Sequence, residues 1–411
     1  MRNVQTYSED SRPTRILLDV RDRQPTGISR YALGMVRACI HHLGPEVSLG
    51  VLCEGHQLPR LEGMSCLPQV TILIPTRTEL FARFDDAILK QISEFRPQHY
   101  HGFANFVDPR MPCPWSVTIH DLIRLTPGMS SHYADHEFAA RYSESERANL
   151  LEAVAWMRAI SGAQAPANGS SMRTYLELMI QIAANHSEFI LTPSTTTARA
   201  LRERVGGEAP IYVDPPQSDP AFSPVAEPSA AQQINVQSPY LLFVGTPGEH
   251  KRLDLVESYL SEWDTGMGPT PRLLAVGDRA GGNLYERIRH PAATGQGVER
   301  LGYVSDELLS GLYRSALAVV VPSVLEGYCL PADEALQSGG RVLASRIEVL
   351  TDRLAADRVR FFTLHDGAEF LNAVAWAVRH YGKPSPNAGH EASSRLDVPL
   401  LLDLLGHGES D

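Results

Sequence analysis

The sequence predicts an α/β protein with two domains, each built around a parallel β-sheet. Short apolar segments alternate with helical segments through residues 14–213, and the same alternation restarts at residue 240. Between the two regions lies a proline-rich stretch that lacks large apolar residues. The chain of 411 residues also exceeds the size that a single core usually serves. The prediction is therefore two α/β domains joined by a linker.

The first domain is predicted to span residues 14–213, after a flexible tail at 1–13. Short apolar runs predict strands at 15–20, 48–53, 70–74, 115–119, 188–191 and 210–213. Helices are predicted at 29–42, 80–95, 132–160, 172–184 and 195–205, with the stretch GAQAPANGSS (162–171) as an interruption. Ser29 is expected to cap the first of these helices. Alternation of this kind favours a parallel sheet.

The linker DPPQSDPAFSPVAEPSAAQQINVQSP occupies 214–239 and leads into a second domain at 240–381. Strands are predicted at 240–245, 272–277, 298–301, 318–321, 341–345 and 359–362. Helices are predicted at 252–263, 306–315, 331–338 and 368–380. Residues 382–411 are polar and then briefly apolar, which predicts a tail that docks one short segment.

The composition limits the classes of function. A net charge of −11 and a pI near 5.8 argue against binding of nucleic acid through a basic surface. The five cysteines form no C-x-x-C pair, which favours reduced thiols in the cytoplasm. The N-terminal stretch lacks the apolar segment of a signal peptide, and no apolar run reaches the length of a membrane span. We expect a cytoplasmic protein, and peripheral contact with the inner membrane face stays open as an alternative.

Two glutamates eight positions apart, Glu326 and Glu334, lie in the run VVVPSVLEGYCLPADEALQSGG (319–340). A buried strand is followed here by a short loop and a helix, in which Pro331 is expected at the first helical position. The free N–H groups at a helix start favour an anion such as phosphate. A carboxylate on each side could then bind sugar or ribose hydroxyls. The alternative is a surface glutamate beside an ordinary helix.

The segment VGTPGEHKRLDLV (244–256) predicts a strand, a small-residue turn and a helix that begins with His250 and Lys251. A cation at a helix start opposes the helix dipole, and a bound diphosphate would remove this conflict. An exposed lysine is the alternative. In DVRDRQPTGISRYALGMV (19–36), Gly27 lies between a strand and a helix, where the backbone could approach a phosphate closely. A plain flexible turn is equally consistent with this segment.

The run TIHDLIRLTPG (118–128) places His120 and Asp121 at the carboxyl end of a strand, where open α/β sheets bind ligands. His120 could bind a sugar hydroxyl, with Asp121 orienting its ring, or it could only cap the strand. His101 and Asn105 form a weaker pair at another strand end. No P-loop, G-x-G-x-x-G, H-E-x-x-H, Asp-x-Asp or G-x-S-x-G motif is present, so a metal site and serine-hydrolase chemistry have no support.

Together these segments resemble the family 4 glycosyltransferases, most of all their bacterial mannosyltransferase-like members. GYVSDELLSGLYRSALAVVVPSVLEGYCLPADEAL (302–336) resembles the family's segment that ends in E-G-F-G-L-P and E-A nearly position by position. TGISRYALGMV, SVTIHDLIRLTPG and FILTPSTTTARAL resemble three further family motifs. The resemblance covers about residues 14–350. It implies a GT-B fold, in which two Rossmann-like domains face each other across a cleft.

The resemblance also implies roles for individual residues. Glu326 would contact the donor sugar, Glu334 the ribose of the nucleotide, and Lys251 the diphosphate. The remaining contacts would come from His120 beside the sugar, Gly27 from the other domain, and the backbone of Gly327, Tyr328, Cys329 and Leu330. His250 and Thr246 stand where members of the family carry arginines near the diphosphate.

The chain departs from the family at several positions. Cys329 replaces a glycine of the E-G-F-G motif, and His250 replaces a fixed positive charge by a titratable one. Glu348 is only loosely in register with a further family glutamate, and the aromatic-rich helix that closes the family fold is not evident. These differences bear on the donor and on activity more than on the fold.

The implied reaction is transfer of a hexose, mannose or a relative, from a nucleotide-sugar donor such as a GDP- or UDP-hexose to a hydroxyl. The acceptor would be a glycan, a glycolipid or a small molecule, in polysaccharide or glycolipid assembly. The resemblance implies retention at the anomeric carbon, without metal or cofactor. The alternative is a catalytically weakened GT-B scaffold within a glycosyltransferase complex.

Overall fold

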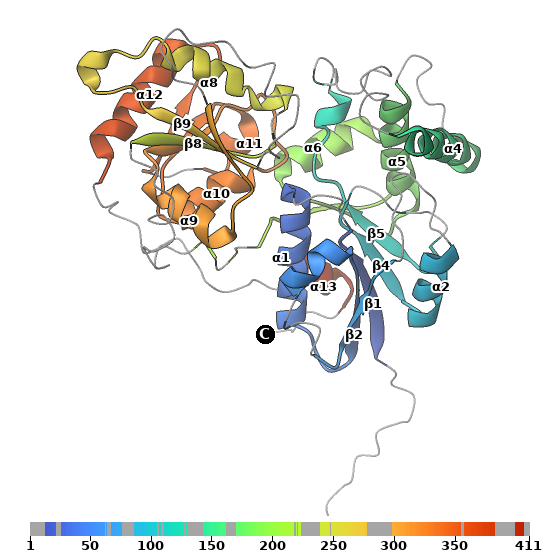
Figure 1. Ribbon diagram of the computed structural model, residues 1–411. Helices are drawn as coiled ribbons and strands as arrows, with labels where there is room; N and C mark the ends of the chain where they lie inside the picture. The colour runs from blue at the N-terminus through green and yellow to red at the C-terminus, as the bar shows by residue number, and fades with distance from the viewer. Residues whose placement is uncertain are drawn as a thin grey trace, which may run out of the picture. The chain divides into compact units, whose positions relative to one another are not determined.

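The computed structural model describes residues 13–21, 26–61, 63, 67–75, 86–104, 107, 111–126, 129, 143–161, 170–217, 219, 221–222, 239–246, 248–277, 298–354, 357–382 and 399–406. The chain divides into two compact units (Figure 1). Unit 1 comprises Met1–Pro193, Thr197–Gln217 and Asp397–Asp411, and unit 2 comprises Ser194–Thr196 and Ser218–Leu396.

Unit 1 contains a seven-stranded sheet with strand order β3-β2-β1-β4-β5-β6-β7, and all its recorded pairings are parallel. The strands are β1 (Thr14–Asp19), β2 (Val47–Leu52), β3 (Val70–Leu73), β4 (His99–Gly102), β5 (Trp115–Thr118), β6 (Ile190–Thr192) and β7 (Ile211–Val213). The helices are α1 (Gly27–His41), α2 (Asp86–Phe95), α4 (Glu144–Ser161), α5 (Ser171–His186), α6 (Thr195–Arg204) and α13 (Leu400–Leu404), with 3₁₀ turns η1 (Gly55–Leu61) and η2 (Ile123–Leu125).

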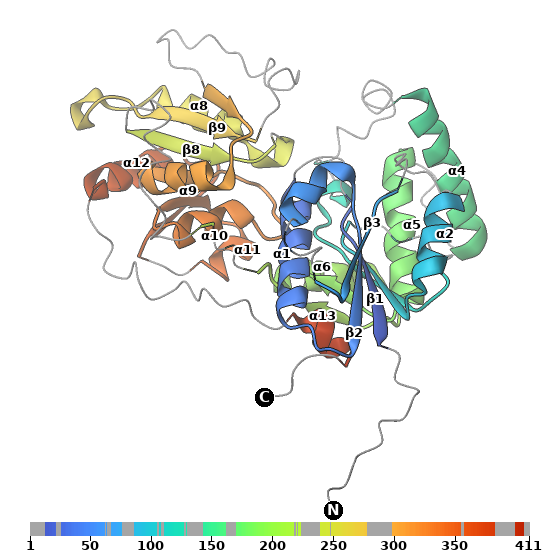
Figure 2. The ribbon, with the colours of Figure 1, turned by 60° about the horizontal axis from the view of Figure 1, so that its bottom comes forward.

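The sheet of unit 1 is buried on both faces, which explains why its strands are continuous apolar runs. Along β1, Ile16 and Leu18 point to a core shared with α1 and α13, whereas Leu17 points to a core shared with α2, α4 and α5. Figure 2 shows α1 on one side of the sheet and α2, α4 and α5 on the other. The same strand therefore contributes to two hydrophobic layers.

Unit 2 contains a six-stranded sheet of order β10-β9-β8-β11-β12-β13, again with parallel pairings. The strands are β8 (Tyr240–Val244), β9 (Arg272–Val276), β10 (Val298–Gly302), β11 (Ala318–Val321), β12 (Val342–Ser345) and β13 (Val359–Phe362). The helices are α8 (Leu253–Leu260), α9 (Asp306–Ser315), α10 (Leu330–Gln337), α11 (Glu348–Thr351) and α12 (Gly367–His380), with 3₁₀ turns η4 (Glu249–Lys251) and η5 (Thr265–Met267). Val319 and Val321 pack toward α9 and α10, and Val320 packs toward α8 and α12.

The prediction of two parallel-sheet α/β domains is confirmed, and most element bounds differ by only a few residues. The predicted cap of the first helix is wrong. Thr26 is the N-cap of α1, and Ser29 is the third helical residue, whose side chain returns a hydrogen bond to the Thr26 backbone in a capping box. The predicted helical residues 80–85 and 132–142 lie outside the described residues. Among the described helices, none combines the length and apolar character that a membrane crossing requires.

Strand β4, with sequence HYHG, is expected from the sequence only as a strand end at His101 and has no predicted bounds, because its histidines do not form an apolar run. Both imidazoles are buried and bonded to hydroxyl groups of β5. Ser116 Oγ lies 2.8 Å from His99 Nε2 and 2.7 Å from His101 Nδ1, and Thr118 Oγ1 lies 2.8 Å from His101 Nε2. Burial lowers the pKa of His99 to about 4 and that of His101 well below its usual range.

Unit 1 is therefore expected to lose stability as the pH falls from about 6.5 to about 4. In this window the unfolded chain binds a proton at His99 and the folded chain does not, so acid favours unfolding. His99 alone would lower the free energy of unfolding by about 3 kcal/mol over the full window. Urea titrations at pH 7 and pH 4.5 measure the change. His99→Asn should reduce the slope of stability against pH, of which His101 keeps a part, and the exposed His186→Asn should leave the slope unchanged. Equal slopes in both variants would contradict this origin.

The C-terminal segment 382–411 is assigned to a tail by the sequence, and the structure describes a helix within it. Leu401 and Leu402 of α13 are 0% and 1% exposed and lie in the hydrophobic core of unit 1. Backbone N–H groups of Leu400 and Leu401 donate to the Asp214 carboxyl group, which is buried after β7. Leu401 and Leu402 therefore cover the face of the unit 1 sheet on which α1 also packs.

Candidate functional site

The strand order of unit 2 marks one place where a ligand can bind. From β8 the chain continues to β9 on one side, and β11 pairs with β8 on the other side. Open parallel sheets bind ligands outside the carboxyl ends of the strands at such a switch point. Two connections meet there, residues 245–252 after β8 and residues 322–329 after β11. Both segments that carry the predicted donor contacts therefore lie at this switch point.

An ion pair joins these two connections. Lys251 Nζ lies 2.5 Å from Glu326 Oε1, and the two side chains are 16% and 8% exposed. Ser323 Oγ donates to the same oxygen at 2.6 Å, and the Ser323 carbonyl accepts a hydrogen bond from Ser345 Oγ. Burial raises the pKa of Glu326, but the charge of Lys251 and the hydrogen bonds from Lys251 and Ser323 outweigh it, so the pKa is lowered. Glu326 is therefore a carboxylate at neutral pH.

The two carboxylate oxygens of Glu326 have different surroundings. Oε1 accepts from both Lys251 and Ser323, whereas Oε2 makes no hydrogen bond within the part of the chain that the structure describes. An oriented carboxylate with one oxygen available suits a ligand hydroxyl donor. Ser323 was not singled out from the sequence, because a serine two residues after a strand has no distinctive signal.

Lys251 does not begin a helix, so that part of the sequence interpretation is wrong. Residues Glu249–Lys251 form the 3₁₀ turn η4, and α8 begins at Leu253 after Arg252, whose φ of 41° is left-handed. The turn is tied to the second connection, because Val324 N donates to the His250 carbonyl at 2.7 Å. Thr246 is exposed in the same connection. The short turn directs Lys251 to Glu326 instead of leaving it on a helix surface.

Glu334 lies inside α10 and is 6% exposed. Its Oε2 accepts a hydrogen bond from the Tyr313 hydroxyl of α9 at 2.7 Å. Tyr313 is fully buried, so α9 orients the carboxyl group from within the core. The structure therefore supports Glu334 through a tyrosine that the sequence reasoning did not identify.

Cys329 occupies a position that favours glycine. Its φ of 82° and ψ of 69° are left-handed, and it is the N-cap of α10. Such a backbone costs a non-glycine residue about 1–3 kcal/mol. Burial raises the pKa of the Cys329 thiol to about 12. This left-handed backbone explains why the family that the chain resembles carries glycine at this position.

The helix that follows begins one residue earlier than predicted. Leu330 is the first residue of α10, so Pro331 is the second helical residue and not the first. Gly327 is buried, and Tyr328 and Leu330 are partly exposed. The loop residues named by the sequence therefore form one continuous turn that starts at Glu326.

The candidates of unit 1 lie at the carboxyl end of its own sheet. His120 is 8% exposed, and its Nε2 lies 2.6 Å from the Phe103 carbonyl at the end of β4. Tyr31 packs edge-on against the ring, and burial lowers the pKa of His120. Asp121 Oδ1 accepts from Ile123 N, so the described hydrogen bond that orients the His120 ring comes from Phe103.

Four further candidates remain, and the structure describes three of them. Gly27 is the first residue of α1, directly after its cap Thr26. His101 is fully engaged inside the sheet by Ser116 and Thr118, and Asn105 lies outside the described residues. Glu348 is exposed at the start of α11. His101 is therefore a structural residue and not a ligand contact.

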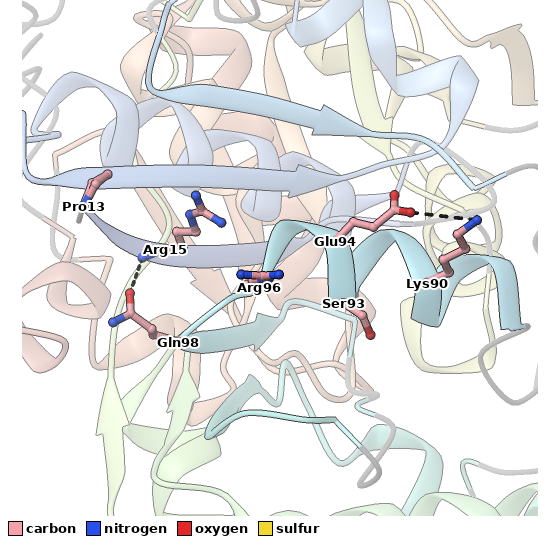
Figure 3. A pocket seen from close by; sticks show the side chains of 7 residues that line it. All are labelled: Pro13, Arg15, Lys90, Ser93, Glu94, Arg96 and Gln98. Atoms are coloured by element: carbon pink, nitrogen blue, oxygen red, sulfur yellow. Dashed lines mark hydrogen bonds and ion pairs between the residues drawn. The ribbon is translucent and has the colours of Figure 1, made fainter.

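One cavity lies away from these residues. It measures about 520 Å³ and is lined by Pro13, Arg15, Lys90, Ser93, Glu94, Arg96 and Gln98 (Figure 3). It lies at the amino ends of β1 and β4, opposite to the carboxyl ends of these strands. Lys90 and Glu94 pair across one turn of α2 with side chains 77% and 66% exposed. Because open sheets bind ligands at the carboxyl end, we assign no site to it.

Comparison with solved structures identifies the architecture. HepE from Anabaena, solved in complex with UDP-glucose, superposes with a TM-score of 0.62 at 16% identity, over 95% of this chain and 97% of that one. The chain has the GT-B fold. Two further GT-B neighbours agree. Sucrose-phosphate synthase from Thermosynechococcus elongatus has a TM-score of 0.61 at 17% identity, over 90% and 92% of the two chains. WaaG, a glycosyltransferase involved in lipopolysaccharide biosynthesis, has a TM-score of 0.61 at 13% identity, over 95% and 98%.

Sequence comparison finds a family match over part of the chain. Residues 226–377, which include Lys251, Glu326 and Glu334, match the family described as Glycosyl transferases group 1. D-inositol 3-phosphate glycosyltransferase from Nocardiopsis dassonvillei is 32% identical over 170 residues, which are 38% of this chain and 40% of that protein. The match therefore spans less than half the length of this curated relative. Over the matched residues the chain is therefore similar to group 1 glycosyltransferases.

Proposed function

We propose that the protein is a retaining glycosyltransferase that transfers a hexose from a nucleotide-sugar donor to a hydroxyl acceptor. The observation that carries the proposal is the buried pair of Lys251 and Glu326 at the switch point of unit 2. The family match over the same residues and a neighbour solved with UDP-glucose support it.

The geometry suggests distinct tasks for the two charges. Glu326 is held by Lys251 and Ser323 through Oε1, and Oε2 would accept a hydrogen bond from a sugar hydroxyl. Lys251 would lie beside the diphosphate and stabilise the negative charge that develops as the sugar leaves. Glu334, oriented by Tyr313, would bind the ribose of the nucleotide. Backbone N–H groups of residues 327–330 would complete the donor site at the start of α10.

In the proposed reaction the bond from the anomeric carbon to the diphosphate breaks and a bond to the acceptor oxygen forms on the same face of the sugar. The departing phosphate oxygen takes the acceptor proton, so no separate protein nucleophile is needed. Catalysis then rests on positioning and on stabilisation of the leaving group. The proposed donor is a GDP- or UDP-hexose, in which the hexose is mannose or a related sugar. The acceptor would be a hydroxyl of a glycan, a glycolipid or a small molecule. The enzyme would act in the cytoplasm, with peripheral contact at the inner membrane face as the alternative.

A screen of GDP- and UDP-hexoses by thermal unfolding and by slow donor hydrolysis tests the proposal. A donor at about 100 Kd should raise the free energy of unfolding by about 2.7 kcal/mol. Glu334→Ala should weaken this stabilisation because the ribose contact is lost, and Glu262→Ala, at an exposed position after α8, serves as the matched control. If no nucleotide sugar stabilises or is hydrolysed by the wild-type protein, the proposal fails and the scaffold alternative stands.

A further inference from the structure

Arg353, which has no place in the sequence motifs, makes three contacts with the loop and helix of the candidate site. Its Nη2 donates to the Tyr328 carbonyl at 2.6 Å, and its guanidinium carbon lies 3.8 Å from the centroid of the Tyr328 ring. Its Nη1 forms an ion pair with Asp333 in the first turn of α10. One side chain thus contacts the loop before Cys329 and the helix after it.

These contacts need the planar fork of arginine. A guanidinium can stack on a ring, donate to a carbonyl and pair with a carboxylate at the same time, whereas a lysine ammonium is a single point charge. The side chains of Arg353 and Asp333 are only 22% and 21% exposed. Arg353 Nε is buried without a hydrogen-bond partner among the described residues. A buried donor without a partner is unfavourable, so Nε does not favour this orientation of the guanidinium. The contacts of Nη1 and Nη2 must therefore hold it.

The residue between the two contact points is the strained one. Cys329 has its left-handed backbone directly after Tyr328 and four residues before Asp333. Strained conformations persist where the surrounding structure determines them from several sides. Arg353 supplies such a restraint from a distant part of the sequence.

We propose that Arg353 is a positioning residue that holds the turn 327–330 in its donor-binding geometry. Its effect on the donor rests on the proposed function, whereas its effect on the turn does not. The two effects therefore have separate measurements.

The first measurement is alkylation of Cys329 by iodoacetamide, followed peptide by peptide with mass spectrometry. Cys329 is 6% exposed and reacts only when the turn opens. Arg353→Ala should raise its rate about 10-fold or more, the change that a loss of ~1.4 kcal/mol of restraint produces. Arg353→Lys should raise it less, because lysine keeps the charge beside Asp333. Cys39 and Cys53, both buried in unit 1, should be unaffected.

A matched control is Arg358→Ala. Arg358 is also buried in unit 2 and donates to the Leu336 and Gly340 carbonyls at the other end of α10. If this variant exposes Cys329 as much as Arg353→Ala does, loosening is general and the proposal is overturned. If Arg353→Ala does not fold, Arg353→Lys decides, and a wild-type alkylation rate in that variant overturns the proposal.

The second measurement is donor kinetics. Arg353→Ala should raise the donor KM about 10-fold with kcat changed far less, because the residue would shape the donor site without touching the reacting atoms. An unchanged KM together with an unchanged alkylation rate overturns the proposal. Faster alkylation in a protein whose wild type binds no nucleotide sugar would support the role of Arg353 in the turn and refute the proposed function.

Discussion

Replacing Lys251 by methionine is expected to lower donor turnover about 10²- to 10³-fold and to destabilise unit 2 by about 3 kcal/mol. The first effect follows from loss of the charge beside the leaving diphosphate. The second follows because Glu326 would remain buried as an unpaired carboxylate. The pKa of Glu326 should rise in this variant, so the loss of stability should be smaller at acidic pH.

The double variant Lys251→Met with Glu326→Gln separates the two effects. It removes both charges, so it should regain most of the stability of the wild type while its turnover remains low. Arg346→Ala, which breaks the more exposed pair with Glu369, is the control and should cost at most about 1 kcal/mol. Recovery of turnover in the double variant would contradict the role of Lys251 at the diphosphate. Chemical denaturation and steady-state donor kinetics provide both quantities.

Truncating both core leucines of α13, by Leu401→Ala with Leu402→Ala, is expected to unfold unit 1 or to leave it marginal. Each side chain is almost fully buried, and a buried leucine changed to alanine costs about 2–5 kcal/mol. Domains are stable by only about 5–15 kcal/mol, so the sum approaches the whole stability. Hydrogen exchange read by mass spectrometry should show faster exchange throughout unit 1 and unchanged exchange in unit 2.

The control for this variant is Leu151→Ala on α4, whose side chain is 57% exposed. The same chemical change at an exposed position should alter exchange little. If hydrogen exchange in unit 1 is as slow in the double leucine variant as in Leu151→Ala, then α13 does not contribute to the stability of unit 1.

The sequence predicted the parallel sheets because strands such as β11 are buried on both faces and therefore carry uninterrupted apolar residues. It failed at β4, where the side chains that fill the interior are histidines satisfied by hydroxyl groups of a neighbouring strand. Partners on another strand leave no mark in a local window. The sequence did predict that the C-terminal tail docks one short segment, but it did not predict the helix α13, whose apolar segment is short and whose packing partners lie hundreds of positions away in the chain.

For the candidate site, local sequence patterns singled out Lys251, Glu326 and Glu334, and a family resemblance then implied their roles. It did not show that Lys251 and Glu326 touch, because their contact depends on the adjacency of β8 and β11. Nor did it show Ser323, Tyr313 or Arg353, whose roles come only from their neighbours in space. His101 shows the opposite error, since a histidine at a strand end proved to be a hydrogen-bonded part of the core.

The place of α13 also affects the order in which the two units can be completed during synthesis. The main segment of unit 2, Ser218–Leu396, is continuous and is synthesised before Leu401 and Leu402. Most of unit 1 is therefore synthesised long before two leucines of its own core, with the main segment of unit 2 made in between. Until these leucines are made, the face of unit 1 that they cover stays exposed to water and to other chains, a state in which nascent proteins are prone to aggregate and are bound by chaperones.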